Sequence, residues 1–157
     1  MKHIWKLVIA ILVCEAAGAI GGLATASSVR TWYATLAKPP FNPPAWIFGP
    51  VWTALYALMG VAAWLVWRKG LGAGGVRPAL ALFGVQLLLN VAWSFIFFGL
   101  HSPMYAFFEL ILLWLAILAT AFAFAKVAPL AAILLVPYIL WVSFAGVLNF
   151  YIWILNR

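Results

Sequence analysis

Residues 32–44 read Trp-Tyr-Ala-Thr-Leu-Ala-Lys-Pro-Pro-Phe-Asn-Pro-Pro, and this short stretch separates two long apolar segments. Four of its last six positions are proline: Pro39, Pro40, Pro43 and Pro44. Because proline fixes φ and lacks a backbone donor, the stretch is predicted to be a stiff loop. Its adjacent Trp and Tyr favour the membrane–water interface. Two interpretations stay open: the loop is a lid over whatever the helices enclose, or it is an interfacial anchor.

The composition on either side of this loop indicates a lipid environment. Of 157 residues, 69% are hydrophobic and 7% charged, which is more apolar surface than a soluble domain of this size can bury. Helix-breaking residues and charged residues divide the chain into five apolar segments. Each is near or above the roughly 20 residues that a helix needs to cross the hydrocarbon core. We predict a single all-α membrane domain over residues 1–157, a bundle of five transmembrane helices at about 4–26, 44–67, 78–100, 104–125 and 129–155.

The first and the fifth of these segments each have a feature that bears on their assignment as membrane helices. The first apolar run, residues 7–23, follows two lysines and resembles a signal peptide, but it is longer than a usual signal core and contains Glu15. It is therefore interpreted as a retained helix. Pro137 lies inside the fifth segment and is expected to kink it, because proline removes a helical hydrogen bond.

The net charge of +7 comes from basic residues at segment ends rather than on one face. This distribution argues against a nucleic-acid partner and is interpreted as a topology signal. One set of segment ends carries Lys2, Lys6, Arg68, Lys69, Arg77 and Lys126, and the other carries Arg30, Lys38 and Arg157. The positive-inside rule then predicts a cytoplasmic N-terminus and an outward-facing proline-rich loop.

Few residues are available for ordinary catalytic or metal chemistry. A single cysteine excludes an internal disulfide, and two histidines and two acids far apart in sequence give no metal-ligand spacing. Glu15 lies in mid-membrane, where it must be protonated, paired or facing a cavity. With Gly18 and Gly22 on its face it favours an interhelical hydrogen bond beside a close-packed strip, a ligand or proton site being the alternative. Glu109 lies near a helix start, where a structural role is expected.

Three segments each present an aromatic face with a polar or small neighbour. Read at i+3, i+4, i+7 and i+8, the faces comprise Trp52 and Tyr56; Asn90, Trp93, Ser94 and Phe97; and Trp141, Ala145, Leu148 and Asn149. They are suited to enclose a flat, largely apolar ligand, with Asn90 and indole donors fixing its orientation. The alternative is that the tryptophans form interfacial belts and ordinary helix packing.

The end of the fifth segment fits a loose cholesterol-contact pattern of an aliphatic residue, a spaced Tyr and a spaced basic residue. The matching residues are Leu148, Tyr151 and Arg157. Tyr151 and Arg157 are equally suited to be interfacial anchors.

Several motifs, taken in order, resemble the translocator protein family (TspO/MBR), which includes the peripheral benzodiazepine receptor and bacterial tryptophan-rich sensory proteins. The first-loop signature runs from Trp32-Tyr33 through Leu36 and Lys38-Pro39 to Pro43-Pro44, with Phe41 where the family usually has Trp. The later motifs are Val51-Trp52 with Leu55-Tyr56, Gln86-x-x-x-Asn90-x-x-Trp93, Val136-Pro137-Tyr138-x-x-Trp141 and Leu148-Asn149-Phe150. The resemblance covers nearly the whole chain.

This resemblance implies five transmembrane helices, a homodimer, and a ligand held under the first loop. It implies binding of protoporphyrin IX, haem and other tetrapyrroles, with lipids or sterols as further partners and no required cofactor. Carried over residue by residue, the ligand site comprises Trp32, Tyr33, Trp52, Tyr56, Asn90, Trp93, Phe97, Trp141, Ala145 and Leu148.

The function expected from the resemblance is tetrapyrrole binding for transport or sensing in a bacterial cell membrane. The alternative is an enzyme-like, light-dependent degradation of protoporphyrin IX, in which the catalytic positions match Trp52 and Trp141. A sterol-binding scaffold is a third possibility.

Overall fold

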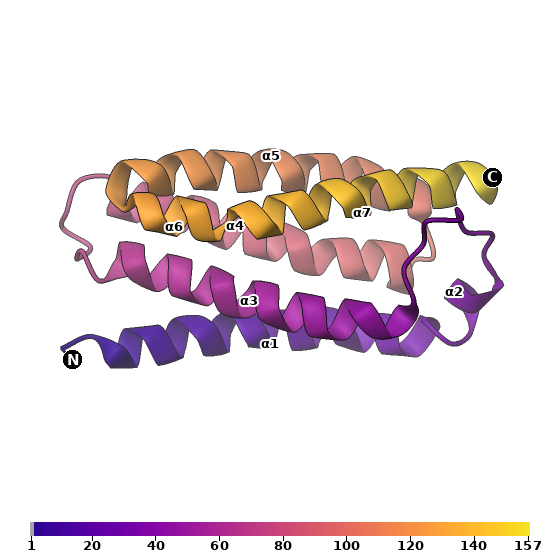
Figure 1. Ribbon diagram of the computed structural model, residues 1–157, viewed down its shortest axis with the longest axis horizontal. Coiled ribbons are helices and arrows are strands. Elements are labelled where there is room, and N and C mark those ends of the chain that lie inside the picture. Colours follow the sequence, from indigo (N-terminus) through magenta and orange to yellow (C-terminus); the bar gives the residue numbers. More distant parts are fainter. Residues whose placement is uncertain (1) are drawn as a thin grey trace.

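The computed structural model describes residues 2–157 as a bundle of long helices, with no strand among those residues (Figure 1). The elements are α1 (Ile4–Ser28), α2 (Trp32–Thr35), α3 (Ala45–Trp67), α4 (Val76–Ser94), the π-helical turn η1 (Phe95–Gly99), α5 (Pro103–Val127), α6 (Pro129–Leu134) and α7 (Val136–Leu155). Five helices are long and apolar enough to cross a membrane: α1, α3, α4 with η1, α5, and α6 with α7. The predicted five-helix membrane bundle is confirmed.

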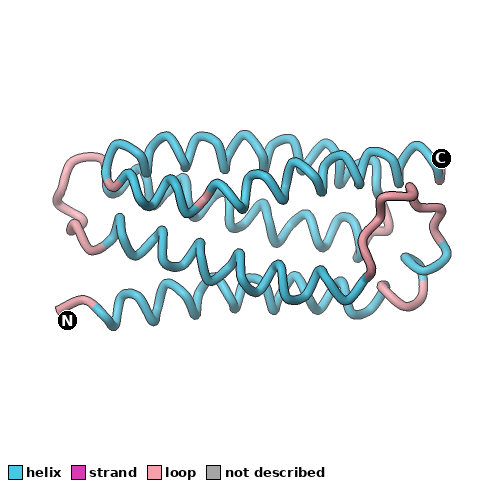
Figure 2. Tube along the Cα trace, in the orientation of Figure 1, coloured by secondary structure: helices cyan, strands magenta, loops and turns pink. Residues whose placement is uncertain are grey.

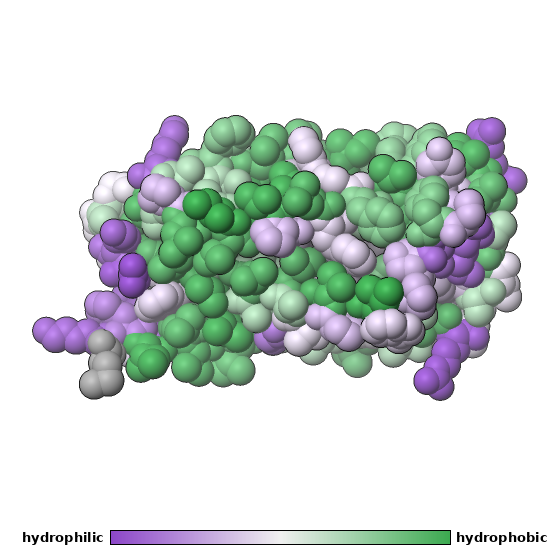
Figure 3. Space-filling model, in the orientation of Figure 1, coloured by the Kyte–Doolittle hydropathy of each residue, from purple (hydrophilic) through white to green (hydrophobic). Residues whose placement is uncertain are grey.

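The helices run alternately up and down, so the chain begins at one end of the bundle and finishes at the other (Figures 1 and 2). The glycine-containing link between α3 and α4 lies at the N-terminal end, and α2 with its proline-rich loop lies at the C-terminal end. We call the end with the N-terminus the inner end and the end with the proline-rich loop the outer end, as names for positions in the bundle alone. Apolar side chains cover most of the visible surface between them, and hydrophilic residues gather at both ends (Figure 3).

Local chemistry explains several helix boundaries. The Ser102 hydroxyl accepts a hydrogen bond from the Tyr105 N–H at 3.3 Å and so caps the start of α5. Pro103 occupies the first helical position, where a backbone N–H would have no partner within the helix. Gly75 precedes α4 with φ of +83°, a conformation that favours glycine. The expected effect of Pro137 is confirmed as a break between α6 and α7 at Leu135.

The proline-rich loop differs in one detail from the prediction. Residues Trp32–Thr35 form one helical turn, α2, because the first proline comes only at Pro39. The remainder, residues 36–44, is irregular, and the Asn42 N–H donates to the Pro39 carbonyl at 3.1 Å. The loop is therefore a helical turn followed by a proline-stiffened crossing.

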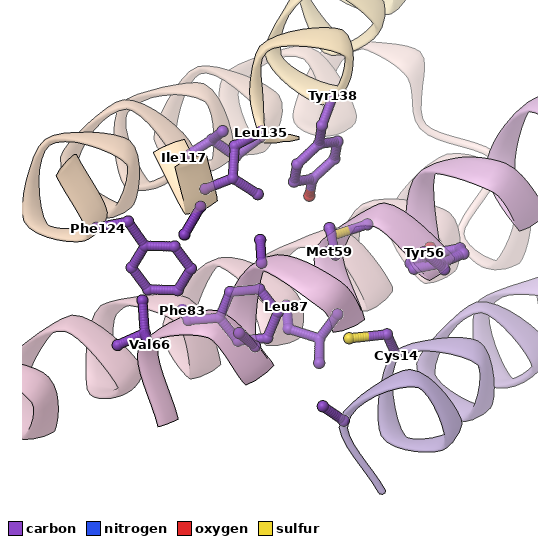
Figure 4. Packing of buried hydrophobic residues seen from close by; sticks show 14 of the residues in the cluster. Cys14, Tyr56, Met59, Val66, Phe83, Leu87, Ile117, Phe124, Leu135 and Tyr138 are labelled. Carbon is purple, nitrogen blue, oxygen red and sulfur yellow. The ribbon is translucent and has the colours of Figure 1, made fainter. Parts of the chain in front are cut away.

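Two clusters of buried side chains divide the bundle along its length. The larger cluster includes Met59, Phe83, Phe124 and Tyr138 (Figure 4). The smaller includes Tyr33, Phe97, Phe98, Leu148 and Ile152 at the outer end.

Glycines bring α1 close to its neighbours. A Cβ on Gly18 would lie 2.5 Å from the Tyr56 ring, and one on Gly21 would lie 3.0 Å from the Ser94 hydroxyl oxygen. The prediction that Gly22 also packs closely is wrong, since no atom of another helix within residues 2–157 lies within 4 Å of the Cβ that it would carry. Gly18 and Gly21 of α1 therefore pack against α3 and α4, whereas Gly22 faces open space.

Candidate ligand-binding cavity

A cavity of about 750 Å³ lies between the outer halves of α1, α3, α4 with η1, and α7. This volume falls within the roughly 300–1,000 Å³ common for small-molecule sites. Tyr33 of α2 contributes from the loop, and α5 contributes none of the lining residues. Helices distant in sequence thus form one chamber under the proline-rich loop.

Nine of the ten residues predicted to bind a ligand line this cavity. They are Tyr33, Trp52, Tyr56, Asn90, Trp93, Phe97, Trp141, Ala145 and Leu148. The aromatic faces were visible from helical spacing, and their convergence follows from the way in which α3, α4 and α7 surround the same space.

Trp32 is the exception, because it does not line the cavity. Its indole stacks on the His101 ring, with ring centroids 4.4 Å apart and planes at 11°, and it meets Phe97 edge-on at 5.6 Å. His101 is held in turn by Ser28, whose hydroxyl lies 3.0 Å from Nε2 and donates to the Phe98 carbonyl at 2.7 Å. Trp32 therefore supports the wall from behind.

A buried hydrogen-bond network closes the inner end of the cavity. The Tyr56 hydroxyl donates to Asn90 Oδ1, Asn90 Nδ2 donates to the Tyr138 hydroxyl at 2.7 Å, and Tyr138 donates to Gln86 Oε1 at 2.7 Å. Asn90 is 3% exposed. Sequence reasoning expected this amide to orient a ligand, but its oxygen and one N–H are engaged by tyrosines. Asn90 ties α3, α4 and α7 together, and because it also lines the cavity, its contact with a ligand stays a prediction.

The indole N–H groups around the cavity differ in availability. Trp93 Nε1 donates to Asn149 Oδ1 at 3.0 Å, and Asn149 in turn donates to the Pro103 carbonyl at 2.8 Å. Trp141 Nε1 is buried and has no hydrogen-bond partner within residues 2–157. An unpaired buried donor is costly, so a ligand acceptor near Trp141 would be stabilised by pairing with it.

Among the lining residues outside the predicted ligand set, Glu15, Arg30 and Phe48 bring charge or an aromatic ring to the cavity. Glu15 lines the cavity and makes no hydrogen bond to another described residue, so the favoured interhelical hydrogen bond is absent. Arg30 was interpreted as a topology signal only, yet it lines the cavity from the turn just after α1. It follows the lining residues 15, 19, 22 and 26, which share one face of that helix. Phe48 meets Trp141 edge-on at 6.0 Å, a contact with no simple spacing signal.

The cholesterol-contact residues do not form one surface. Leu148 is 6% exposed and lines the cavity, whereas Tyr151 is 45% exposed and packs edge-on against Phe41 at 5.4 Å. Arg157 lies beyond the end of α7. The pattern in sequence is thus divided between the interior of the bundle and its outside.

The proline-rich loop is fastened over the outer end. The side chain of Asn156, just after α7, accepts from the Ala37 N–H at 2.9 Å and donates to the Ala37 carbonyl at 2.8 Å. The Tyr33 hydroxyl donates to Asn42 Oδ1 at 3.2 Å. Burial raises the pKa of Tyr33 above its ordinary value, outweighing the hydrogen bond to Asn42, which lowers it. The phenol therefore stays a neutral donor that links α2 to the irregular part of the loop.

A bundle of five membrane-spanning helices around an aromatic cavity defines a multi-pass membrane protein with an internal chamber. The chain belongs to the TspO/MBR family, whose model matches residues 10–154. It is 44% identical over 155 residues to the tryptophan-rich protein TspO of Chlorobaculum tepidum, covering 99% of this chain and 98% of that protein.

Animal and bacterial relatives agree with this assignment. The translocator protein of Homo sapiens is 45% identical over 124 residues, covering 78% of this chain and 73% of the human protein. The tryptophan-rich sensory protein of Cereibacter sphaeroides is 37% identical over 151 residues, covering 96% of this chain and 91% of that protein. The resemblance drawn from the loop and tryptophan motifs is confirmed.

Proposed function

We propose that this protein binds a tetrapyrrole, such as protoporphyrin IX or haem, in the cavity under the proline-rich loop, for transport or sensing. The observation that carries the proposal is a chamber of about 750 Å³ walled by the rings of Trp52, Trp93, Trp141 and Phe97. Such walls suit a large flat ring, because aromatic faces and edges contact it over a wide area. The expectations of a homodimer, a cytoplasmic N-terminus and a bacterial cell membrane belong to the same proposal.

Polar groups near these walls fit the remaining chemistry of a tetrapyrrole. Arg30, the single basic residue lining the cavity, offers a guanidinium to a carboxylate. The unpartnered Trp141 N–H offers a donor in the wall. Sterols, which carry no carboxylate, would use neither the charge of Arg30 nor most of the flat aromatic surface.

Binding of protoporphyrin IX is expected to quench tryptophan emission, because four of the ten tryptophans line the cavity. Ala145→Phe should weaken binding by about tenfold or more, since a phenyl ring would occupy space that the ligand needs. Titrating detergent-solubilised protein with protoporphyrin IX measures both effects.

Ala119→Phe is the matched control for this titration, because Ala119 is exposed on α5 and does not line the cavity. Equal affinities for the two variants would show that the porphyrin binds elsewhere. Absence of saturable quenching in the wild type would refute the proposed function.

A second candidate function uses the same cavity for light-dependent oxidation of protoporphyrin IX. It is favoured by Trp52 and Trp141, two oxidisable indoles that both line the chamber. The bound porphyrin would be the photosensitiser and molecular oxygen the oxidant. Neither a general base nor a nucleophile is needed for such chemistry.

Loosening the loop is expected to open a route from the cavity to water. Asn156→Ala removes two hydrogen bonds to Ala37, each worth about 0.5–1.5 kcal/mol. Pro39→Gly with Pro40→Gly adds up to about 1 kcal/mol per site of conformational freedom. Each change should speed protoporphyrin release about three- to tenfold in stopped-flow measurements, with the melting temperature of the bundle nearly unchanged.

Thr35→Ala is the control for these loop variants, because the Thr35 hydroxyl bonds only within its own turn, to the Trp32 carbonyl. Unchanged release in both loop variants would identify the loop as an interfacial anchor rather than a lid.

A further inference from the structure

The wall of the cavity is uncovered on one side. The lining residues from α4, η1 and α7 are buried or half-buried, whereas several from α1 and α3 are exposed. The exposed ones are Ala19, Gly22 and Ala26 on α1 and Ala45, Trp46, Gly49 and Thr53 on α3. The chamber therefore reaches the surface of the bundle between these two helices.

The packing of α1 on α3 explains why the opening occurs at the outer half. At the inner half a Cβ on Gly60 would lie 2.6 Å from the Ile11 Cα, so the two backbones are in direct contact. Further along α1, Gly18 lies against the Tyr56 ring. Beyond that contact, no atom of another described helix lies within 4 Å of a Cβ on Gly22 or on Gly49. The two helices are thus in contact up to Gly18 and leave free space after it.

The opening faces lipid rather than water. Gly22 lies within the membrane-spanning segment Ile4–Ser28, and Gly49 lies within Ala45–Trp67. At the outer margin Trp46 is 74% exposed, which suits an aromatic residue at the membrane interface. The proline-rich loop closes the end of the bundle above it through the bonds of Asn156 to Ala37.

The charged residues that line the cavity indicate how a ligand would be oriented in the opening. Glu15 lines the cavity from α1, and Arg30 lines it from the turn that follows α1. The part of α1 between Glu15 and Ser28 alone spans about 20 Å. The chain has two acidic residues, Glu15 and Glu109, and Glu15 lies too far from Arg30 to neutralise it. The guanidinium at the outer margin is thus placed to hold an anionic group at the interface while an apolar body moves inward.

We propose that the ligand enters and leaves sideways from the bilayer, through the opening between α1 and α3 bounded by Gly22 and Gly49. The ligand class is a membrane-dissolved amphiphile with a carboxylate that stays near Arg30. This inference rests on the proposed function for the choice of probe, protoporphyrin IX, and concerns the route by which the probe reaches the cavity.

Filling the opening tests the route. Gly22→Leu combined with Gly49→Leu places two branched side chains where the structure has open space, so the fold should tolerate them. In neutral phosphatidylcholine vesicles preloaded with protoporphyrin IX, both association and dissociation rates should fall about tenfold, with the equilibrium affinity within about threefold of wild type. Stopped-flow quenching of tryptophan emission measures the rates.

Gly84→Leu is the matched control, since Gly84 lies on α4 with open space around it and does not line the cavity. It should leave both rates unchanged. In a background that also carries Asn156→Ala, the two leucines should lose most of their effect on release, because a second route to water is then open.

The outcomes separate the route from the proposed function. Unchanged rates in the double leucine variant, with normal binding, would overturn the lateral route and leave the proposed function standing. A loss of affinity with an unchanged association rate would put the leucines inside the binding volume and also overturn the route. Absence of binding in the wild type would refute the proposed function itself.

Discussion

Replacing both cavity indoles by Trp52→Phe and Trp141→Phe is expected to abolish light-dependent loss of protoporphyrin IX while leaving its binding partly intact. Phenylalanine keeps an aromatic ring in the wall, so most of the contact area survives, but it is much harder to oxidise than an indole. The rate of porphyrin loss under illumination should fall by about tenfold or more relative to wild type. Porphyrin absorbance and product mass spectrometry, with a dark sample, measure the effect.

A matched double variant separates position from tryptophan content. Trp5→Phe with Trp153→Phe removes two indoles that do not line the cavity and should leave photo-oxidation unchanged. If the cavity double variant degrades the porphyrin as fast as wild type, the oxidative function is wrong and the binding function is unaffected. If both double variants lose activity equally, the loss reflects indole content and not the cavity.

The largest expected effect on folding comes from Gly60→Leu. A Cβ on Gly60 would lie 2.6 Å from the Ile11 Cα and 2.9 Å from its backbone nitrogen, so the obstacle is backbone that cannot rotate away. Inserting extra carbon atoms into a packed core costs about 1–3 kcal/mol, and a backbone contact belongs at or above the upper end of that range. We expect α1 to detach from α3 over its inner half, with a marked fall in melting temperature in detergent.

Gly84→Leu again provides the comparison, because it adds the same side chain to a membrane-spanning helix where space is open. It should melt near the wild-type temperature. Gly60→Ala should fall between the two, since its single methyl group already meets Ile11. Equal melting temperatures for Gly60→Leu and Gly84→Leu would contradict the close approach of α1 and α3.

The length of the apolar segments, their hydropathy, and the prolines and charges at their ends were sufficient to predict the architecture. A helix needs roughly 20 apolar residues to cross a bilayer, and prolines and charges mark where each run ends. The predicted boundaries consequently lie within two residues of the helices in the structure, for example 44–67 against Ala45–Trp67. The separation of basic residues between two ends follows from the same boundaries. Helical spacing also identified the aromatic faces of Trp52, Asn90 and Trp141, because their facing direction is a local property.

The tertiary structure decided which side chains are free to act. Trp32 belongs to the family motif, yet it stacks on His101, which lies far from it in sequence. Asn90 is occupied by Tyr56 and Tyr138, and Trp141 is left unpaired, because the partners of a polar group come from other helices. The opening beside Gly22 exists because α1 contacts α3 at Gly60 and Gly18 and leaves open space beyond them. Sequence periodicity defines the face of each helix, and only the packing of helix on helix determines what that face meets.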